Sequence, residues 1–424
     1  MSNAIDSEKN TTNWLITGYV CLLLLLPARV YTQYTVSFFR VHSNLNVFYV
    51  NLFDLLLLGL SIITLLPRFK LPVHKKNLTY VCTFMVIEAV SLLLLIITGH
   101  SDYIGEVISK THIVLCAYVF VVCASERMTW KQKSSIYVVA LIILVLASFF
   151  LSGYAAYSSS NRVGSLGFGS NETAMFACAL IAISLFSKTF SVSIRTAVSI
   201  VSFMALLNIA SRRGIVVALL ILLAWVLSEI VIRRKKHLST KTLAAVFVIA
   251  LIALFIWIRY QNQLLGYIYN SSFALRYRYI TSSGGQALDF SDRGNIFSEA
   301  IEHVEDRPFW GYFGSDLFLA QGTVTHSHNT LLQMMVTHGI IFGSIIDLFF
   351  ITCFARAIRI VIWSRNNDCD NFSVLMAVIY IVYFVFDLAG YLLWNPKGLF
   401  LILTISFFLN EEYQKIFLGE PKSL

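Results

Sequence analysis

The chain has 424 residues, of which 57% are hydrophobic and 13% charged, with a formal net charge of +9. Soluble domains carry about 25% charged residues, so this composition excludes an ordinary soluble protein. Most Lys and Arg residues lie in short loops between apolar runs, where they indicate membrane orientation and not nucleic-acid binding.

About twelve apolar runs follow one another, and most are long enough to cross a hydrocarbon core of about 30 Å. The predicted fold class is therefore an all-α, polytopic membrane protein. The expected spans are roughly 14–35, 47–66, 78–98, 111–125, 135–152, 172–188, 194–210, 214–232, 242–258, 330–354, 372–392 and 397–410. The first run lacks a small-residue cleavage site, so we expect it to be retained as a span.

The basic loops predict the orientation of these spans. Alternate loops carry the Lys and Arg residues, among them 68–76, 127–133, 233–241 and 356–365. By the positive-inside rule that side is cytoplasmic, which places both termini in the cytoplasm. The expected organisation is then spans one to nine over 1–258, a long external loop over 259–329, and three further spans with a cytoplasmic tail over 330–424.

The external loop is predicted to contain a helix that begins near Ser291 and ends before Pro308. Ile296, Ala300 and Val304 recur at helical spacing, so the helix is amphipathic and is expected to lie on the membrane with its apolar side down. An aromatic turn, Phe309-Trp310-Gly311-Tyr312-Phe313-Gly314, is expected after it.

Arginines at external positions are candidate anion ligands. Arg212 and Arg213, in Ser-Arg-Arg-Gly at the outer end of a span, either clamp phosphate oxygens or snorkel from a helix end. Arg293 opens the amphipathic helix, where it either helps to bind an anion or pairs with a capping Asp. Arg276 and Arg278 alternate with tyrosines and are either anion ligands or surface positive charges.

The segment His326-Ser327-His328-Asn329 precedes the tenth span. Asn329 is expected to be its N-cap, which places His328 beside the positive end of a helix dipole. A neutral His328 could accept a proton as a general base, and the alternatives are a metal site or a structural role. A Gly-rich external loop ends at Asn171, which is expected to cap the sixth span and to contact glycan or lipid.

Five ionisable residues lie within the apolar runs, where a charge is a functional candidate by default. They act either as proton-relay residues or as paired structural groups, and they are Arg29, Asp54, Glu88, Asp347 and Asp387.

Three motifs in this order resemble the bacterial O-antigen polymerase and O-antigen ligase superfamily. They are Ser-Arg-Arg-Gly, then Asp-Arg-Gly-Asn-Ile-Phe with Asp-Arg-Pro-Phe-Trp-Gly-Tyr, then His-Asn-Thr-Leu-Leu-Gln with His-Gly-Ile-Ile-Phe-Gly. The resemblance covers about 160–345 by motif and the whole chain by topology.

The resemblance implies a multi-helix C-type glycosyltransferase of the bacterial inner membrane that inverts configuration and uses no metal or other cofactor. Its donor would be a glycan on undecaprenyl pyrophosphate, bound on the periplasmic face. The family's helix-end arginine matches Arg212 or Arg213, its loop arginine matches Arg293, and its histidine matches His328. His326 is an extra position, which with Asn329 and Asn171 is a candidate substrate contact.

Polymerase and ligase differ in the acceptor, which is a lipid-linked repeat unit for the first and lipid A–core for the second. The His-Asn-x-x-Leu-Gln pattern is more similar to that of the polymerases. Membrane lipids and a chain-length regulator are further expected partners. The alternative from another class is a transporter such as a lipid-linked oligosaccharide flippase. Two symmetric halves would, however, place the major loop centrally and in the cytoplasm, whereas here it follows the ninth span and is external.

Overall fold

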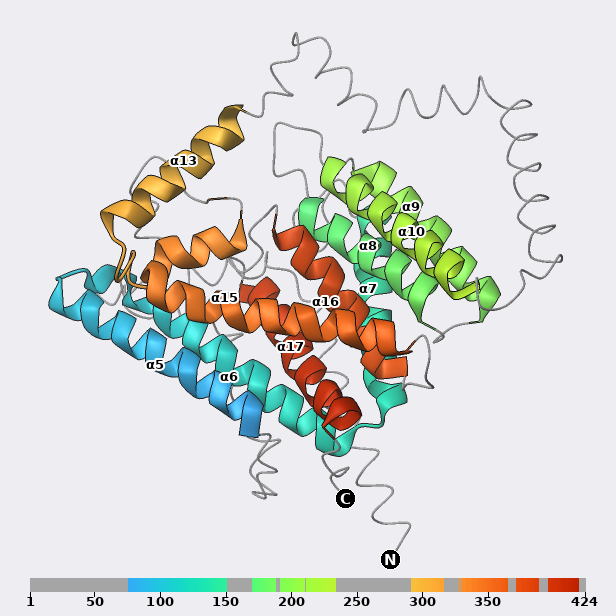
Figure 1. Ribbon diagram of the computed structural model, residues 1–424, viewed down its shortest axis with the longest axis horizontal. Helices are drawn as coiled ribbons and strands as arrows, with labels where there is room; N and C mark the ends of the chain where they lie inside the picture. The colour runs from blue at the N-terminus through green and yellow to red at the C-terminus, as the bar shows by residue number, and fades with distance from the viewer. Residues whose placement is uncertain are drawn as a thin grey trace, which may run out of the picture. The chain divides into compact units, whose positions relative to one another are not determined.

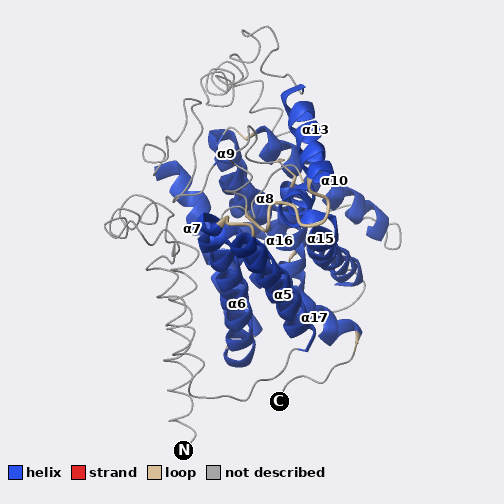
Figure 2. Cartoon of the chain, turned by 90° about the vertical axis from the view of Figure 1, so that its left-hand side faces the viewer, coloured by secondary structure: helices blue, strands red, loops and turns tan. Residues whose placement is uncertain are grey.

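The computed structural model describes the chain over 75–150, 170–187, 191–209, 211–233, 291–315, 327, 329–364, 371–388 and 396–418. Within these residues all regular structure is helical (Figures 1 and 2). Two compact units divide the chain, the first made of 1–143 with 290–424 and the second of 144–289.

The first unit is a bundle of long apolar helices. Its cores form where α17 packs on α6 and α16, and where α15 packs on α16. Aromatic side chains fill these contacts, with Phe349 between Tyr80 and Phe407 and with Phe408 edge-on to Phe372. The helices are α5 (Lys75–Ile97), α6 (Ile104–Arg127), most of α7 (Trp130–Phe150), α13 (Ser291–Asp306), α15 (Thr330–Ser364), α16 (Asn371–Asp387) and α17 (Pro396–Phe417), with a short 3-10 turn, η2 (Ser101–Tyr103), before α6.

Apart from α13, the described α-helices overlap the predicted spans, although the span predicted at 330–354 is interrupted at Gly339. Among the described residues, three helical stretches are long and apolar enough to cross a membrane, namely Asn77–Ile97, Ser101–Val122 and Val192–Ile209. Shorter apolar helices cover Ser170–Phe186, Arg213–Val226 and Phe372–Asp387. The expected spans at 14–35, 47–66 and 242–258 lie outside the described residues, so the count of twelve stays a prediction.

The helix ends that the basic loops predict to be cytoplasmic lie at one end of the first unit. Asn77, near the start of α5, bonds through its amide nitrogen to the Phe407 carbonyl at 3.0 Å and contacts Asn410 of α17. Arg356 of α15 donates to the same Asn410 side chain. The Lys133 ammonium near the start of α7 lies 4.5 Å from the Phe372 ring centroid. These helix ends therefore share one side of the bundle, as the alternation of loops requires.

The second unit contains α8 (Ser170–Phe186), α9 (Val192–Ile209) and α10 (Arg212–Arg233). The α8 helix packs on both of the others. Gly214 allows α10 to approach closely, because a Cβ atom there would lie 2.9 Å from the Ala174 Cβ and 2.8 Å from Leu206 Cδ2. The Cys178 thiol donates to the Gly214 carbonyl at 3.2 Å, so α8 and α10 begin side by side.

The span predicted at 330–354 is not one continuous helix, so the prediction of an uninterrupted span was wrong. Gly339, with φ 77° and ψ 170°, breaks α15 into a short helix, Thr330–His338, and a long one that follows it. This backbone conformation is essentially restricted to glycine. A Cβ at Gly339 would also lie 2.3 Å from the Phe309 carbonyl oxygen, so the break is shaped by the turn that packs against it.

We expect Gly339→Ala to destabilise the protein more than Gly99→Ala does. Both glycines have φ +77°, but a Cβ at Gly99 meets nothing within 4 Å. Gly99→Ala should cost only the left-handed strain, about 1–2 kcal/mol. The clash at position 339 should add about 1–3 kcal/mol. Thermal unfolding of the two purified variants in one detergent measures this difference. Equal unfolding midpoints would contradict the predicted clash at position 339.

Candidate functional site

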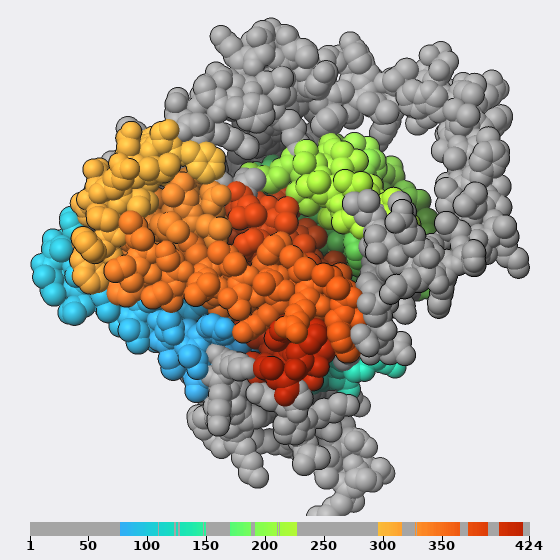
Figure 3. Space-filling model, viewed as in Figure 1, coloured from blue at the N-terminus to red at the C-terminus, as the bar shows by residue number. Residues whose placement is uncertain are grey.

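In the first unit, α13 lies alongside the short helix Thr330–His338 (Figures 1 and 3). Ala300 and Val336 are the buried pair between them, with Val304 and Leu332 packed around it. Beyond these contacts the Ile340 amide donates to the Pro308 carbonyl at 2.8 Å. The predicted amphipathic helix is thus confirmed. Its apolar face was expected to lie on the membrane, but Ala300 and Val304 pack on protein instead, whereas Phe297 and Ile301 stay 37% and 50% exposed.

Both helices run in the same direction and begin at the same end, as Figure 1 shows. A helix start presents unpaired N–H groups and the positive end of the helix dipole, so two adjacent starts favour an anion between or above them. Arg293 lies in the first turn of α13, and His328 directly precedes the short helix with Asn329. The side chain of Arg293 and the whole of His328 lie outside the described residues.

The residues on either side of His328 are held firmly. The Asn329 side-chain oxygen accepts from the Leu332 amide at 3.1 Å, so the predicted N-cap is confirmed. Its amide nitrogen donates to the Leu388 carbonyl at 2.9 Å. Ser327 is buried, and its hydroxyl donates to the Asn329 carbonyl at 2.8 Å. The Asn329 side chain, a candidate substrate contact, is therefore already engaged in a cap and in a link to the end of α16.

The aromatic turn that follows α13 fits into the break of α15. The Tyr312 and Gly314 amides donate to the Val336 and Thr337 carbonyls at 3.2 and 2.9 Å. These bonds supply donors to carbonyls that the interrupted helix leaves without their usual partners. Phe313 adds apolar burial by packing with Leu95 and Val107, on α5 and α6.

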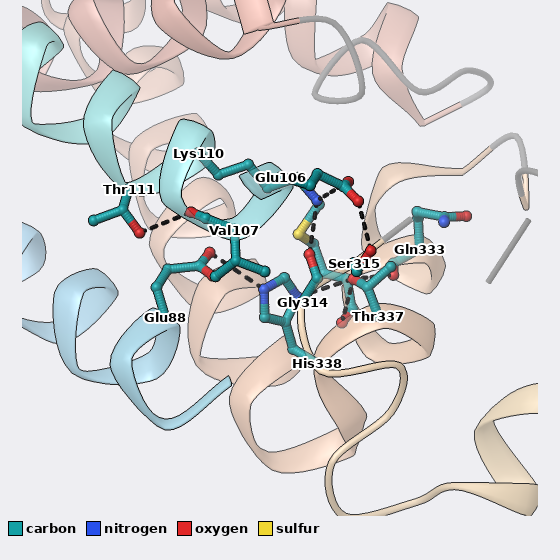
Figure 4. A network of polar contacts seen from close by, with 11 residues as sticks. Glu88, Glu106, Val107, Lys110, Thr111, Gly314, Ser315, Gln333, Thr337 and His338 are labelled. Carbon is teal, nitrogen blue, oxygen red and sulfur yellow. Dashed lines mark hydrogen bonds and ion pairs between the residues drawn. The ribbon is translucent and has the colours of Figure 1, made fainter. Parts of the chain in front are cut away.

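Polar side chains of α6 bond to the same turn (Figure 4). Lys110 donates to the Gly314 carbonyl at 2.8 Å and forms an ion pair with Glu106 at 2.9 Å. The Ser315 hydroxyl donates to the other Glu106 oxygen at 2.5 Å. Glu106 and Lys110 were not among the predicted site residues, although their i,i+4 spacing is that of a helix ion pair.

A buried acid–imidazole pair joins α5 to the end of the short helix. Glu88 Oε1 lies 3.4 Å from His338 Nε2, and the two side chains are 7% and 3% exposed. The other ring nitrogen of His338 lies 2.9 Å from the Thr337 hydroxyl. Glu88 was predicted to be either a relay residue or a paired structural group, and it is paired. Its partner was missed because a His 250 positions away gives no local signal.

A second histidine contact joins α13 to the turn. The Tyr312 hydroxyl and His303 Nδ1 are 2.6 Å apart, and the Arg307 guanidinium lies 4.9 Å from the Tyr312 ring centroid. Burial raises the pKa of Tyr312, and although Arg307 lowers it, the net shift is upward. The phenol therefore keeps its proton near neutral pH.

In the second unit, Ser211 of the Ser-Arg-Arg-Gly motif caps α10 and bonds to Asn171 of α8. The Ser211 hydroxyl accepts from the Gly214 amide at 3.2 Å, which makes it the cap of α10. The same hydroxyl donates to the Asn171 side-chain oxygen at 3.3 Å. Asn171 was predicted to cap α8, but the helix already begins at Ser170. The starts of α8 and α10 are thus tied together at the position of Arg212 and Arg213.

The described residues include only some of the predicted site. Arg213 is half-buried, whereas the side chain of Arg212 lies outside the described residues, as do Arg276, Arg278 and His326. Arg212 and Arg213 belong to the second unit and Arg293 to the first, and each is described within its own unit. Of the other charges predicted inside spans, Asp347 and Asp387 are buried, and Arg29 and Asp54 lie outside the described residues.

Residues 197–346 match the protein family described as O-antigen ligase. This chain carries an O-antigen ligase domain. The matched segment begins within α9 and ends in the long part of α15, so it includes the Ser-Arg-Arg-Gly motif, α13, the aromatic turn and the break. No curated protein matches the chain.

The match confirms the resemblance seen in the sequence, and the O-antigen ligase-family protein is a multi-pass membrane glycosyltransferase of lipopolysaccharide biosynthesis. All arginine and histidine positions predicted for the site fall inside the matched segment, and Asn171 falls outside it. Family membership covers both polymerases and ligases, and it implies a lipid-linked glycan as substrate.

Ser211→Ala should lower the free energy of unfolding of the O-antigen ligase-family protein by about 1 kcal/mol, because it removes a helix cap. It also removes the bond to Asn171. Ser211→Thr, which keeps both a donor and an acceptor, is the matched control and should retain most of the stability. The midpoint of unfolding in urea or on heating measures both, and a harmless Ser211→Ala would contradict the capping role.

Proposed function

We propose that this protein polymerises surface polysaccharide at the periplasmic face of the inner membrane. It transfers a growing glycan from undecaprenyl pyrophosphate to a second lipid-linked repeat unit. The donor's pyrophosphate binds at the start of the helix that carries Arg293, and the acceptor sugar lies beside His328. In this arrangement both termini are cytoplasmic, and a chain-length regulator is a further partner.

One observation carries this proposal. The helix whose first turn contains Arg293 and the helix that follows His328 lie side by side and start at the same end. Two helix dipoles and an arginine therefore favour an anion close to a histidine that the same dipole keeps neutral. This transfer requires a site that binds the leaving pyrophosphate and a base that accepts the proton of the acceptor hydroxyl.

The reaction then follows from the charges. The acceptor hydroxyl oxygen attacks the anomeric carbon from the face opposite the pyrophosphate, and its proton passes to His328. The bond between the anomeric carbon and the phosphate oxygen breaks as negative charge develops on undecaprenyl pyrophosphate. In the first unit, Arg293 is the arginine proposed to stabilise that charge, because it is already in place at the start of α13. In the second unit, Arg212 or Arg213, with Arg276 and Arg278, stay predicted anion ligands.

His328→Ala should reduce transfer by about 10²–10⁴-fold, the usual contribution of a general base. His112→Ala is the matched control, because the described contact of that ring is with Cys116, one turn away on α6. The rate of glycan transfer in membranes containing equal amounts of each variant measures the effect. Wild-type activity in the His328 variant would remove this residue from the mechanism.

A polysaccharide gel from the deletion strain distinguishes polymerase from ligase. For a polymerase, we expect lipid A–core bearing a single repeat unit, restored to a ladder by the gene. Bare core, with long glycan still on the carrier lipid, would instead assign the ligase reaction. Repeat units retained on the cytoplasmic face would contradict both and would indicate a flippase.

A further inference from the structure

The side chain of Gln333 is fully buried in the short helix Thr330–His338, one turn after Asn329. Its Oε1 atom accepts a hydrogen bond from the Ser327 backbone amide at 2.8 Å. Ser327 is itself 2% exposed and is the residue between the two histidines of the segment. We propose that Gln333 is a positioning residue that sets the orientation of His328 by holding the backbone of Ser327.

The bond from Gln333 acts on a segment that is fixed at its other side as well. Asn329 is held through its cap on Leu332 and through its bond to Leu388. With Ser327 held by Gln333, the main chain is anchored immediately before and immediately after His328. Without the Gln333 bond, Ser327 would keep only its hydroxyl contacts with the Asn329 backbone.

Gln333 can hold Ser327 in place because the short helix that carries it is itself bonded to the aromatic turn at its C-terminal end. The Thr337 hydroxyl donates to the Gln333 carbonyl at 2.9 Å, and the Thr337 carbonyl accepts from Gly314 at 2.9 Å. His338 then joins this end to Glu88 of α5. A continuous set of contacts thus runs from α5 through the break of α15 to Ser327.

This inference rests on the proposed function, in which His328 takes the proton of the acceptor hydroxyl. A general base must lie within about 2.6–3.2 Å of the proton it removes. A misplacement of about 1 Å can cost 10²-fold in rate. Because the pyrophosphate is bound by Arg293 and the helix starts, loss of the Gln333 bond should affect turnover and leave donor binding intact.

The test compares three variants of the full-length protein, with the carrier-linked glycan extracted from the deletion strain as substrate. Gln333→Met has a similar size and removes the acceptor oxygen. Gln333→Glu keeps a carboxyl oxygen at that position. Tyr380→Phe is the matched control, because it removes another buried side chain–backbone bond of the same unit, from the Tyr380 hydroxyl to the Phe350 carbonyl at 2.9 Å. For each variant kcat, the donor KM and the thermal midpoint are measured.

We expect Gln333→Met to lower kcat by about 10–100-fold with the donor KM within about 2-fold of wild type. Gln333→Glu should recover most of the rate, and Tyr380→Phe should lose a similar amount of thermal stability at wild-type kcat. Equal kcat in Gln333→Met and Tyr380→Phe would overturn the positioning role, as would a change confined to KM or the absence of recovery in Gln333→Glu. If Gln333→Met does not accumulate, Gln333→Asn, whose amide is one carbon shorter, is judged by the same criterion.

Failure of the proposed function gives a different result. If the wild-type protein transfers no glycan, or if His328→Ala is as active as wild type, the general-base mechanism is overturned and the positioning role with it. If the wild type is active, His328→Ala is inactive and Gln333→Met is unaffected, only the positioning role is overturned.

Discussion

An interrupted helix has to find new partners for the backbone groups that it exposes. The break at Gly339 separates peptide groups near Val336, Thr337 and Ile340 from their usual helical partners. Leaving such groups unpaired away from water would cost several kcal/mol each. The turn after α13 satisfies three of them through its own backbone. The position of α13, the direction of the short helix and the placement of Ser327 all depend on this fit.

The side chains around the break follow from the same requirement. Once the turn lies between α5 and α6, its outward carbonyl at Gly314 and its hydroxyl at Ser315 need partners, which Lys110 and Glu106 provide. Glu88 is more deeply buried, and only a donor such as His338 can offset the cost of removing its carboxyl from water. Buried polar pairs of this kind stabilise little by themselves, but breaking one is costly, so they favour one arrangement over others.

The sequence predicted those features that depend on neighbours along the chain. The described helices, the amphipathic helix after Ser291 and the cap at Asn329 all follow from hydropathy, helical spacing and residue type. The break at Gly339 could not be predicted in this way, because single glycines are common in continuous transmembrane helices. Its conformation becomes apparent only when the Phe309 carbonyl is found where a Cβ atom would be.

The same distinction applies to the site. The sequence by itself determined that arginines and a histidine stand at the starts of predicted helices, and the order of these motifs was sufficient to indicate the family. Only the tertiary structure decided that α13 and the short helix run side by side, that Ser211 joins α10 to Asn171, and that Gln333 holds Ser327. The physical reason is that caps and apolar periodicity act within a few residues. Contacts such as that of Glu88 with His338 depend instead on how distant helices pack, which no local pattern records.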